Sequence, residues 1–231
     1  MSGLKDTTEI PAPKTPMPTG RKFGAQEGGC RRASIGARRN PEAQAAILEA
    51  GRSLLAEKGY AGFSIDAVAR RAGAGKPTIY RWWPNKADLF IDIYSREKST
   101  SMSLPDRGGL VEDLEAYTCA LWRFWRETSC GSTFRALIAE AQVSETALES
   151  LRNKFMPQRL KDVHTLFSRA VARKEVQAGA VDVLVRLYIG FNWVHLLTGQ
   201  LEEDRQEIRT MAQLLRAAGN GAGKGADLPG Q

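Results

Sequence analysis

The 231-residue sequence predicts an all-α fold in which a small helical domain precedes a larger one. Apolar residues recur at helical spacing from Pro41 onwards, and no run shows the period-two alternation of a β-strand. Residues 64–86 resolve into two short helices separated by Ala-Gly-Ala-Gly, the second polar at its start and aromatic at its end. This layout is typical of a helix-turn-helix, in which one helix supports a second that enters the DNA major groove.

A basic segment precedes the first helix. Residues 1–37 contain four of the ten prolines and six of the 22 glycines but few large apolar residues, so we expect a disordered basic tail. Arg38 and Arg39 at its end can enter a DNA minor groove or touch the backbone, or they can remain solvated. Glycine recurs at the other end of the chain, and a second disordered tail is expected over 219–231.

The first domain is expected over 38–102. Each of its helices has a residue near one end that favours helix initiation or termination. Its first helix begins at Pro41 and ends at Gly59, because glycine readily takes the left-handed position after a last turn. Ser64 caps the second helix through its side-chain oxygen. The helix-turn-helix itself is expected over about 64–83.

Residue types also indicate the turn after the second helix and the starts of the third and fourth helices. Gly73 and Gly75 make the turn, and Pro77 stands in the first turn of the third helix, where its missing N–H costs nothing. Asn85 caps a fourth helix that runs to about Ser101.

The second domain is expected over 110–218, after a boundary at Leu104–Gly109. Its helices are predicted near 110–128, 132–143, 146–176, 181–198 and 203–218. Breaks are predicted at Ser129–Gly131, Gly179 and Gly199, where glycine interrupts the helical spacing.

Positive charge is concentrated in the first part of the chain. Residues 1–95 hold fifteen Lys and Arg against nine Asp and Glu, whereas residues 96–231 hold eighteen against seventeen, within a net charge of +7. A DNA-binding domain needs its charge there to neutralise phosphates. No apolar run approaches a membrane span and no signal peptide is recognisable, so we expect a cytoplasmic protein with no membrane partner.

The sequence offers no catalytic motif. It contains no nucleophile elbow, phosphate-binding glycine loop, zinc-protease motif or Cys–His pair at useful spacing, and we expect no enzyme, no cofactor and no metal site. Cys30, Cys119 and Cys130 are odd in number and widely spaced, which favours reduced structural thiols. Redox sensing by Cys119 with Cys130 would require a lowered thiol pKa.

Two stretches carry a family resemblance: Ala-Gly-Phe-Ser64-Ile-Asp-Ala-Val-Ala and Lys76-Pro-Thr78-Ile-Tyr80, the latter followed by Asn85-Lys86. Over about residues 41–90 the chain resembles the TetR family of bacterial transcriptional repressors. The resemblance implies a homodimer that places two recognition helices on a palindromic operator. It also implies a second domain that binds a small effector and dimerises through its last two helices, about 181–218.

The residues expected to contact DNA lie on and around the second helix of the helix-turn-helix. Lys76 and Arg81 can donate to guanine or phosphate, and Thr78 can meet a thymine. The resemblance implies contacts by Thr78 and Tyr80 and a phosphate at Lys86, beside a helix N-terminus. The full set is Arg38, Arg39, Ser64, Lys76, Thr78, Tyr80, Arg81, Trp82 and Lys86. A solvated polar face is the alternative, and Trp83 is expected to be a core residue.

The sequence departs from the family pattern at two places. Gly75 stands where a capping serine is frequent, and the Trp82–Trp83 doublet replaces a more usual His–Phe pair. Both departures concern the details of base contact rather than the fold.

The second domain is unusually aromatic, and some of its aromatic residues are expected to line a cavity between helices. Because its charges nearly cancel, we expect a largely apolar effector. The candidate effector contacts are Tyr117, Trp122, Trp125, Phe134, Met156, His164, Phe167, Asn192 and Trp193. Most of the aromatics are expected to be core residues, with some lining the cavity, and both histidines are expected to be satisfied or exposed ahead of contacting a ligand.

The sequence therefore predicts a DNA-binding transcriptional regulator, a homodimeric repressor released from its operator by a small effector. One alternative is a helical ligand-binding or scaffolding protein whose basic domain docks to an acidic partner without operator specificity. Another is a protein that packages nucleic acid without sequence preference. Protection of an operator at fixed half-site spacing separates the first from both.

Overall fold

The computed structural model describes residues 40–221, and all regular secondary structure within that range is helical. The predicted tail 1–37, Arg38, Arg39 and residues 222–231 lie outside the described residues. The helices are α1 (Pro41–Gly62), α2 (Ile65–Ala72), α3 (Lys76–Trp82), α4 (Lys86–Ser101), α5 (Leu110–Glu127), α6 (Ser129–Ala141), α7 (Glu145–Ser150), the π-helical turn η1 (Leu151–Phe155), α8 (Met156–Ala172), the 3₁₀ turn η2 (Ala178–Ala180), α9 (Val181–Thr198) and α10 (Arg205–Gly221). The predicted all-α class is confirmed.

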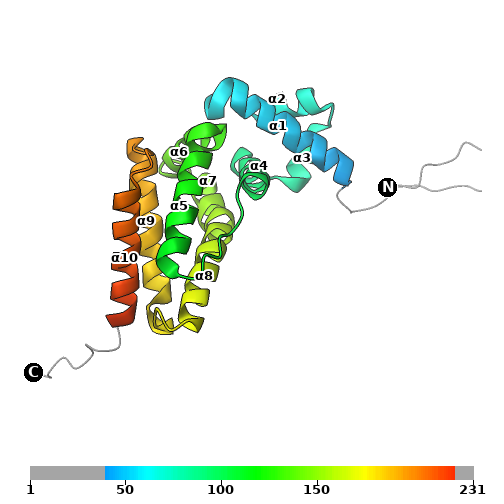
Figure 1. The fold of residues 1–231 in the computed structure, drawn as a ribbon. Helices are drawn as coiled ribbons and strands as arrows, with labels where there is room; N and C mark the ends of the chain where they lie inside the picture. Colours follow the sequence, from blue (N-terminus) through cyan, green and yellow to red (C-terminus); the bar gives the residue numbers. More distant parts are fainter. Residues whose placement is uncertain (1–39, 222–231) are drawn as a thin grey trace, which may run out of the picture. The chain divides into compact units, whose positions relative to one another are not determined.

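The helices form two groups that share α4. Figure 1 shows α1, α2 and α3 together at one end, and α5, α8, α9 and α10 running side by side as a bundle. α4 lies between them and packs on both α1 and η1. A displacement of α4 would therefore disturb both α1 and the η1 turn of the bundle.

The local signals at the start of the chain act as predicted except at Gly59, where a positive φ of 62° kinks α1 but the helix continues to Gly62. The Ser64 side chain caps α2 by accepting a hydrogen bond from the backbone N–H of Ala67, and Asn85 caps α4 by accepting one from Asp88. Gly73 ends α2 in the left-handed conformation, with φ 62°. Gly75 starts α3 without a side-chain hydrogen bond.

The predicted break at Ser129–Gly131 is wrong, because α6 begins at Ser129 directly after α5. Thr128 caps it, accepting a hydrogen bond from the backbone N–H of Cys130. Gly131 is a helical residue, and a Cβ atom there would lie 2.2 Å from the carbonyl oxygen of Trp125. Glycine is needed at this position for the close approach of two helix ends and does not interrupt a helix.

The helical segment predicted near 146–176 is present as a continuous helical run from Glu145, but it is less regular and ends earlier than expected. A π-helical turn separates α7 from α8, and α8 stops at Ala172. The turn beyond it brings the Glu175 carboxylate to the start of α5, where it accepts a hydrogen bond from the Leu110 backbone at 2.9 Å. Glu175 thus supplies the acceptor that Gly109 lacks at that helix end.

α10 differs from the prediction at both of its ends. It starts at Arg205, where the Asp204 carboxylate accepts hydrogen bonds from the next turn. It continues to Gly221, three residues into the predicted tail. Gly219 is buried in it, and a Cβ atom there would lie 2.7 Å from Val176.

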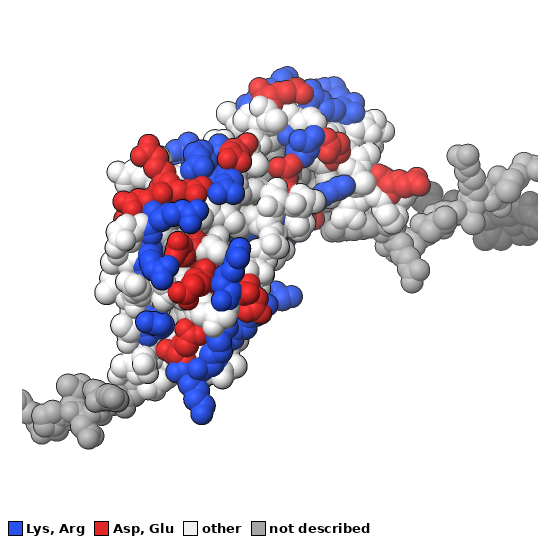
Figure 2. All heavy atoms as spheres, viewed as in Figure 1, with Lys and Arg blue, Asp and Glu red and all other residues white. Residues whose placement is uncertain are grey.

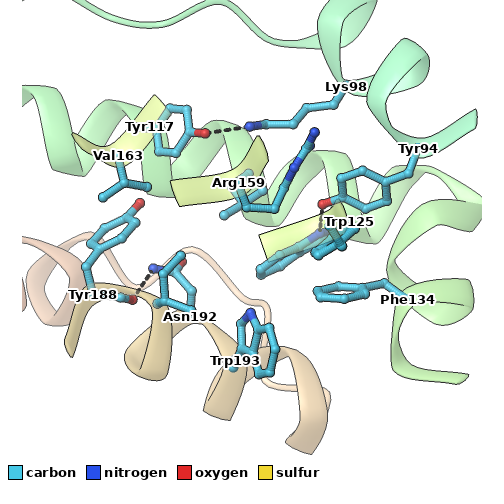
Figure 3. Close-up of a pocket in the computed structure, with 13 residues that line it drawn as sticks. Tyr94, Lys98, Tyr117, Trp125, Phe134, Arg159, Val163, Tyr188, Asn192 and Trp193 are labelled. Atoms are coloured by element: carbon cyan, nitrogen blue, oxygen red, sulfur yellow. Dashed lines mark hydrogen bonds between the residues drawn. The ribbon is translucent and has the colours of Figure 1, made fainter. Parts of the chain in front are cut away.

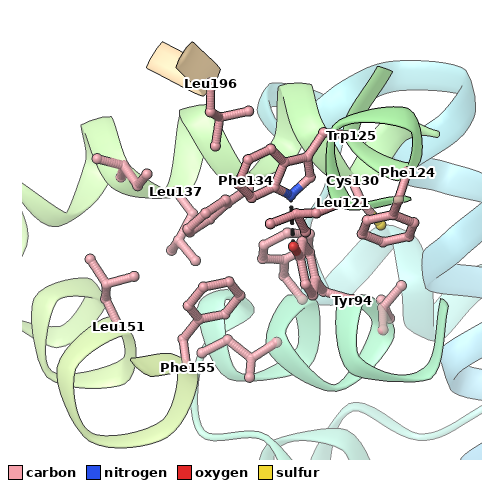
Figure 4. Packing of buried hydrophobic residues seen from close by; sticks show 14 of the residues in the cluster. Tyr94, Leu121, Phe124, Trp125, Cys130, Phe134, Leu137, Leu151, Phe155 and Leu196 are labelled. Atoms are coloured by element: carbon pink, nitrogen blue, oxygen red, sulfur yellow. Dashed lines mark hydrogen bonds between the residues drawn. The ribbon is translucent and has the colours of Figure 1, made fainter. Parts of the chain in front are cut away.

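Tyr94 anchors α4 in the core of the bundle, as Figure 4 shows. Its ring meets Phe124, Phe134 and Phe155 edge-on at centroid distances of 5.3, 5.8 and 5.1 Å. Its hydroxyl accepts a hydrogen bond from the Trp125 indole at 2.7 Å. Burial of one such ring stabilises the fold by about 1.5–3 kcal/mol, so α4 cannot move without disturbing this cluster.

α9 has one buried face and one exposed apolar face. Leu184, Val185 and Tyr188 are buried, whereas Val183 and Leu187 are exposed. Residues 178–198 have the length and apolar composition of a membrane span, with a mean hydropathy of 1.3, contrary to our expectation that no run approaches one. Only 33% of that segment is buried, and its exposed apolar side chains lack cover from the rest of the described chain.

Candidate nucleic-acid interface and internal cavity

Two buried residues hold α3 in place and leave its other side exposed. Ile79 and Trp83 are both buried, and the Trp83 indole donates a hydrogen bond to Asp92 on α4 at 2.7 Å. The prediction that Trp83 is a core residue is confirmed. Lys76, Arg81 and Tyr80 are exposed on this short helix, Tyr80 to 48%.

The cations of this surface already have local partners. The Lys76 ammonium lies 2.7 Å from the Asp66 carboxylate, and the Arg81 guanidinium lies 5.8 Å from the centre of the Trp82 ring. Both side chains are at the surface, where such pairs contribute at most about 1 kcal/mol and exchange readily for a phosphate. Thr78 is half-buried, so its exposed part remains within reach of a ligand on this surface.

Lys86 links the start of α4 to the bundle. Its ammonium lies 4.3 Å from the centre of the Tyr60 ring and 3.2 Å from the Glu140 carboxylate on α6. Burial, followed by the Glu140 carboxylate, raises the pKa of Tyr60 well above its usual value, so the phenol stays neutral. A cation at a helix N-terminus can bind one phosphate oxygen, in competition with Glu140.

A narrow cavity lies inside the bundle (Figure 3). It leaves about 30 Å³ for the centres of water-sized molecules. Its lining residues are Tyr94 and Lys98 of α4, Tyr117, Leu121 and Trp125 of α5, Phe134 of α6, Phe155, Arg159 and Val163 of η1 and α8, and Tyr188, Ile189, Asn192 and Trp193 of α9. Most of these side chains are aromatic or aliphatic, as in small-molecule sites generally.

Polar groups gather where α4, α5 and α8 meet at this cavity. The Lys98 ammonium donates to the Tyr117 hydroxyl at 2.6 Å and to the Asp162 carboxylate at 2.5 Å. Burial lowers the pKa of Lys98, and the Arg159 charge lowers it further, while Asp162 opposes both. Burial, followed by Asp162, raises the pKa of Tyr117 well above its usual value.

The outer face of α5 and α10 has a different character. Figure 2 shows acidic and basic side chains interleaved over it. Arg209 bonds to both Glu112 and Glu115, and Arg205 lies 3.7 Å from Glu115. These charges compensate one another, so this face offers no single-signed field for a polyanion.

Comparison with known proteins identifies the family. Residues 47–93 match the family described as "Bacterial regulatory proteins, tetR family", and residues 104–215 match "Tetracyclin repressor-like, C-terminal domain". The uncharacterized HTH-type transcriptional regulator YdeS of Bacillus subtilis is 31% identical over 153 residues, which span 66% of this chain and 77% of YdeS. The chain belongs to the TetR family.

Other TetR-family proteins agree with this assignment. The DNA-binding transcriptional repressor TetR of Mycobacteroides abscessus is 34% identical over 140 residues, which span 60% of this chain and 72% of that protein. The crystal structure of the TetR family transcription regulator SCO0332 is 27% identical, with a TM-score of 0.67 over 76% of this chain and 97% of that chain. The protein is accordingly a DNA-binding transcriptional regulator.

The structure brings the described DNA-contact candidates of this TetR-family chain together on α3 and the helix starts beside it. Ser64 caps α2, the other candidates from Lys76 to Trp82 lie on α3, and Lys86 opens α4. Their contacts with DNA stay a prediction. Arg38 and Arg39 lie outside the described residues.

Five of the nine effector-contact candidates line the cavity: Tyr117, Trp125, Phe134, Asn192 and Trp193. The other four lie elsewhere. Trp122 and Phe167 are buried in the core, Met156 is partly buried at the start of α8, and His164 lies near Asp182 at 3.8 Å. Asn192 is a weaker polar anchor than expected, because it accepts from the Trp122 indole and donates to the Tyr188 carbonyl.

Sequence reasoning missed the charged members of the cavity. Lys98 and Arg159 stand among other charged residues on amphipathic helices, and a charged side chain on such a helix usually faces solvent. Tyr94, Phe155 and Tyr188 were visible as apolar positions at helical spacing. Their convergence on one cavity depends on how α4, η1 and α9 pack and leaves no trace in local sequence.

The two described cysteines are buried. Burial raises the pKa of the Cys130 thiol to about 12, and burial raises the pKa of Cys119 as well. A raised pKa opposes formation of the reactive thiolate, which favours the structural interpretation of both residues. Within residues 40–221 no group of three His, Cys, Asp or Glu side chains is placed to hold a metal ion.

Proposed function

We propose that this regulator is a cytoplasmic repressor that binds a palindromic operator as a homodimer and is released by a small, largely apolar effector bound in the cavity. The observation that carries this proposal is the position of α4. This helix contributes Tyr94 and Lys98 to the cavity wall, and it begins at Lys86, shortly after α3 ends at Trp82. A ligand that displaces the cavity wall therefore acts on the helix that follows the recognition helix.

The small size of the cavity supports a coupled motion. Small-molecule sites usually measure about 300–1,000 Å³, far more than the space in this cavity. An effector must therefore push lining side chains apart, including those of α4. It releases DNA only if it prefers the displaced arrangement, and a 100-fold preference supplies about 2.7 kcal/mol.

The exposed face of α9 supports a dimer through 181–218. Val183, Leu187, Gly190, Val194 and Leu197 follow one another at spacings of four and three, the pattern of a packed helix seam. The four large residues among them are 47–60% exposed, and nothing lies within 4 Å of a Cβ atom built on Gly190. A shallow groove beside them continues onto α10 at Met211, Leu214 and Leu215. We propose that a second copy of this chain covers this apolar surface, since most oligomers are symmetric pairs that use the same patch on both subunits.

Selection of bound sequences from random DNA tests the operator proposal, since a homodimer enriches a palindrome with half-sites at a fixed spacing. Fluorescence anisotropy with the selected operator then tests the effector proposal across a panel of hydrophobic compounds. Enrichment of no sequence overturns the operator proposal. A palindrome whose affinity no compound changes overturns the effector proposal alone.

A further inference from the structure

Arg159 lies in the cavity with donors that the protein does not use. Its Nη2 donates to the Ser95 hydroxyl at 3.1 Å and lies 3.5 Å from the Gln158 side-chain oxygen. Its Nε and Nη1 are buried and have no hydrogen-bond partner within the described chain. Buried donors are nearly always paired, because water can no longer satisfy them. An arginine with two unused buried donors therefore points to an acceptor from outside the protein.

Aromatic rings hold this guanidinium in position but do not accept the hydrogen bonds that its Nε and Nη1 can donate. Its central carbon lies 5.0 Å from the centre of the Tyr94 ring and 5.3 Å from that of Phe155. Such cation–π contacts hold the charge over the ring faces. The N–H groups lie in the guanidinium plane and still need oxygen acceptors.

The cavity also has an excess of positive charge. Lys98 and Arg159 both line it, no Asp or Glu of the described residues does, and the Asp162 carboxylate beside Lys98 already bonds to that ammonium. One carboxylate against two cations leaves one positive charge uncompensated. The near-neutral total of residues 96–231 hides this excess, because the compensating acidic residues lie on other surfaces.

We infer that the effector carries a carboxylate, which Arg159 binds with support from Lys98. A carboxylate can take one of the two free donors together with the Nη2 hydrogen that makes only the long 3.5 Å contact with Gln158, since the arginine fork matches its two oxygens. Figure 3 places Lys98, Tyr117 and Arg159 near one another, with Phe134 and Trp193 farther away on the other side of the cavity. The ligand is thus amphipathic, with an apolar body among these rings. The inference rests on the proposed effector cavity and specifies what it recognises.

The same arginine connects the ligand to α4. Arg159 belongs to α8 but donates to Ser95 on α4, and Lys98 on α4 bonds to Asp162 on α8. A carboxylate that draws both cations toward itself competes with these two links between the helices. Recognition of the ligand's charge and displacement of α4 therefore depend on the same side chains.

Calorimetric titration of the purified full chain tests the inference with phenylbutyrate, naphthoate and decanoate, each compared with its own primary amide. The amide keeps the apolar body and removes the charge. We expect at least one carboxylate to bind about tenfold more tightly than its amide, a difference of about 1.4 kcal/mol. Equal affinity of acid and amide for every pair overturns the inference and leaves the effector cavity standing.

Variants assign the effect to the side chain. Arg159→Gln is expected to lose the carboxylate preference and to leave amide affinity unchanged, whereas Arg159→Lys keeps the charge but not the fork and loses part of the preference. Arg152→Gln is the matched control, because Arg152 is 59% exposed and lies outside the cavity. Circular dichroism shows whether each variant is folded. If Arg159→Gln is not folded, Arg159→Lys alone provides the test. Unchanged carboxylate affinity in a folded Arg159 variant overturns the inference.

Two further outcomes separate the inference from the proposed function. If neither the acids nor the amides bind, both the carboxylate site and the effector cavity are overturned. If the acids bind through Arg159 but leave operator affinity unchanged, the carboxylate site is supported and its regulatory role is not.

Discussion

The two surfaces left open by the fold, that of α3 and that of α9, differ in chemistry. α3 exposes Lys76, Tyr80 and Arg81, whose polar groups are already solvated and partly paired. α9 exposes Val183, Leu187, Val194 and Leu197, which gain nothing from water. An exposed polar helix suits a polyanion and can remain exposed without one, whereas an exposed apolar stripe needs permanent cover. Exposure alone therefore does not indicate which kind of partner a helix binds. The chemical character of the exposed side chains does.

The largest expected effect comes from placing charge in the α9 stripe. Leu187→Glu combined with Val194→Glu should give a monomer, because two carboxylates would be buried without partners in the proposed interface. Operator affinity should fall by about 100-fold or more, since the two half-sites are no longer bound together. Analytical ultracentrifugation and anisotropy measure the two effects.

Asp182→Lys, also on α9 but outside the stripe and 83% exposed, is the control for this pair and should remain dimeric. A dimer that survives the double substitution would show that the α9 face is covered in another way.

A smaller effect is expected on α3, where we propose that single side chains contact bases. Lys76→Ala or Arg81→Ala should cost about 1–3 kcal/mol of operator binding and relax preference at one or two positions of each half-site. The measurement is a repeat of the random-DNA selection with each variant. A preference that neither substitution alters would assign base recognition to other residues of α3.

Lys86 should behave differently from these two, because a phosphate contact carries no base information. Lys86→Ala should weaken binding to all sequences about equally, and the log–log salt slope should become shallower by about 1 for each phosphate that is no longer neutralised. Titrations at several salt concentrations, with operator and with unrelated DNA, measure both quantities. A changed sequence preference would reverse the roles given to Lys86 and to α3.

The smallest expected effect concerns Glu140, which holds Lys86 at 3.2 Å. Glu140→Gln should raise affinity for DNA by about twofold, because the ammonium no longer has to leave a carboxylate, and a partly exposed pair of this kind is worth less than about 1 kcal/mol. In a Lys86→Ala background the same substitution should change nothing. An equal gain in both backgrounds would show that Glu140 acts through general repulsion of DNA.

The sequence by itself determined the helix-turn-helix. Each signal there is local: the Ser64 and Asn85 caps, the left-handed Gly73 and the inward Ile79 and Trp83 all act on residues within a turn or two. Local signals of this kind need no knowledge of the rest of the chain. The α3 candidates could be named in advance for the same reason.

Only the tertiary structure decided what the second domain encloses. Helical spacing shows which face of a helix is buried, but not what that face meets. Gly131 was therefore expected to break a helix, although it allows two helix ends to touch, and Trp122 could not be told from Trp125 as a cavity residue. Arg159 and Lys98 come from helices far apart in the sequence. Packing alone leaves the Nε and Nη1 donors of Arg159 buried and without partners among residues 40–221, because their surroundings are set by the other helices that line the cavity.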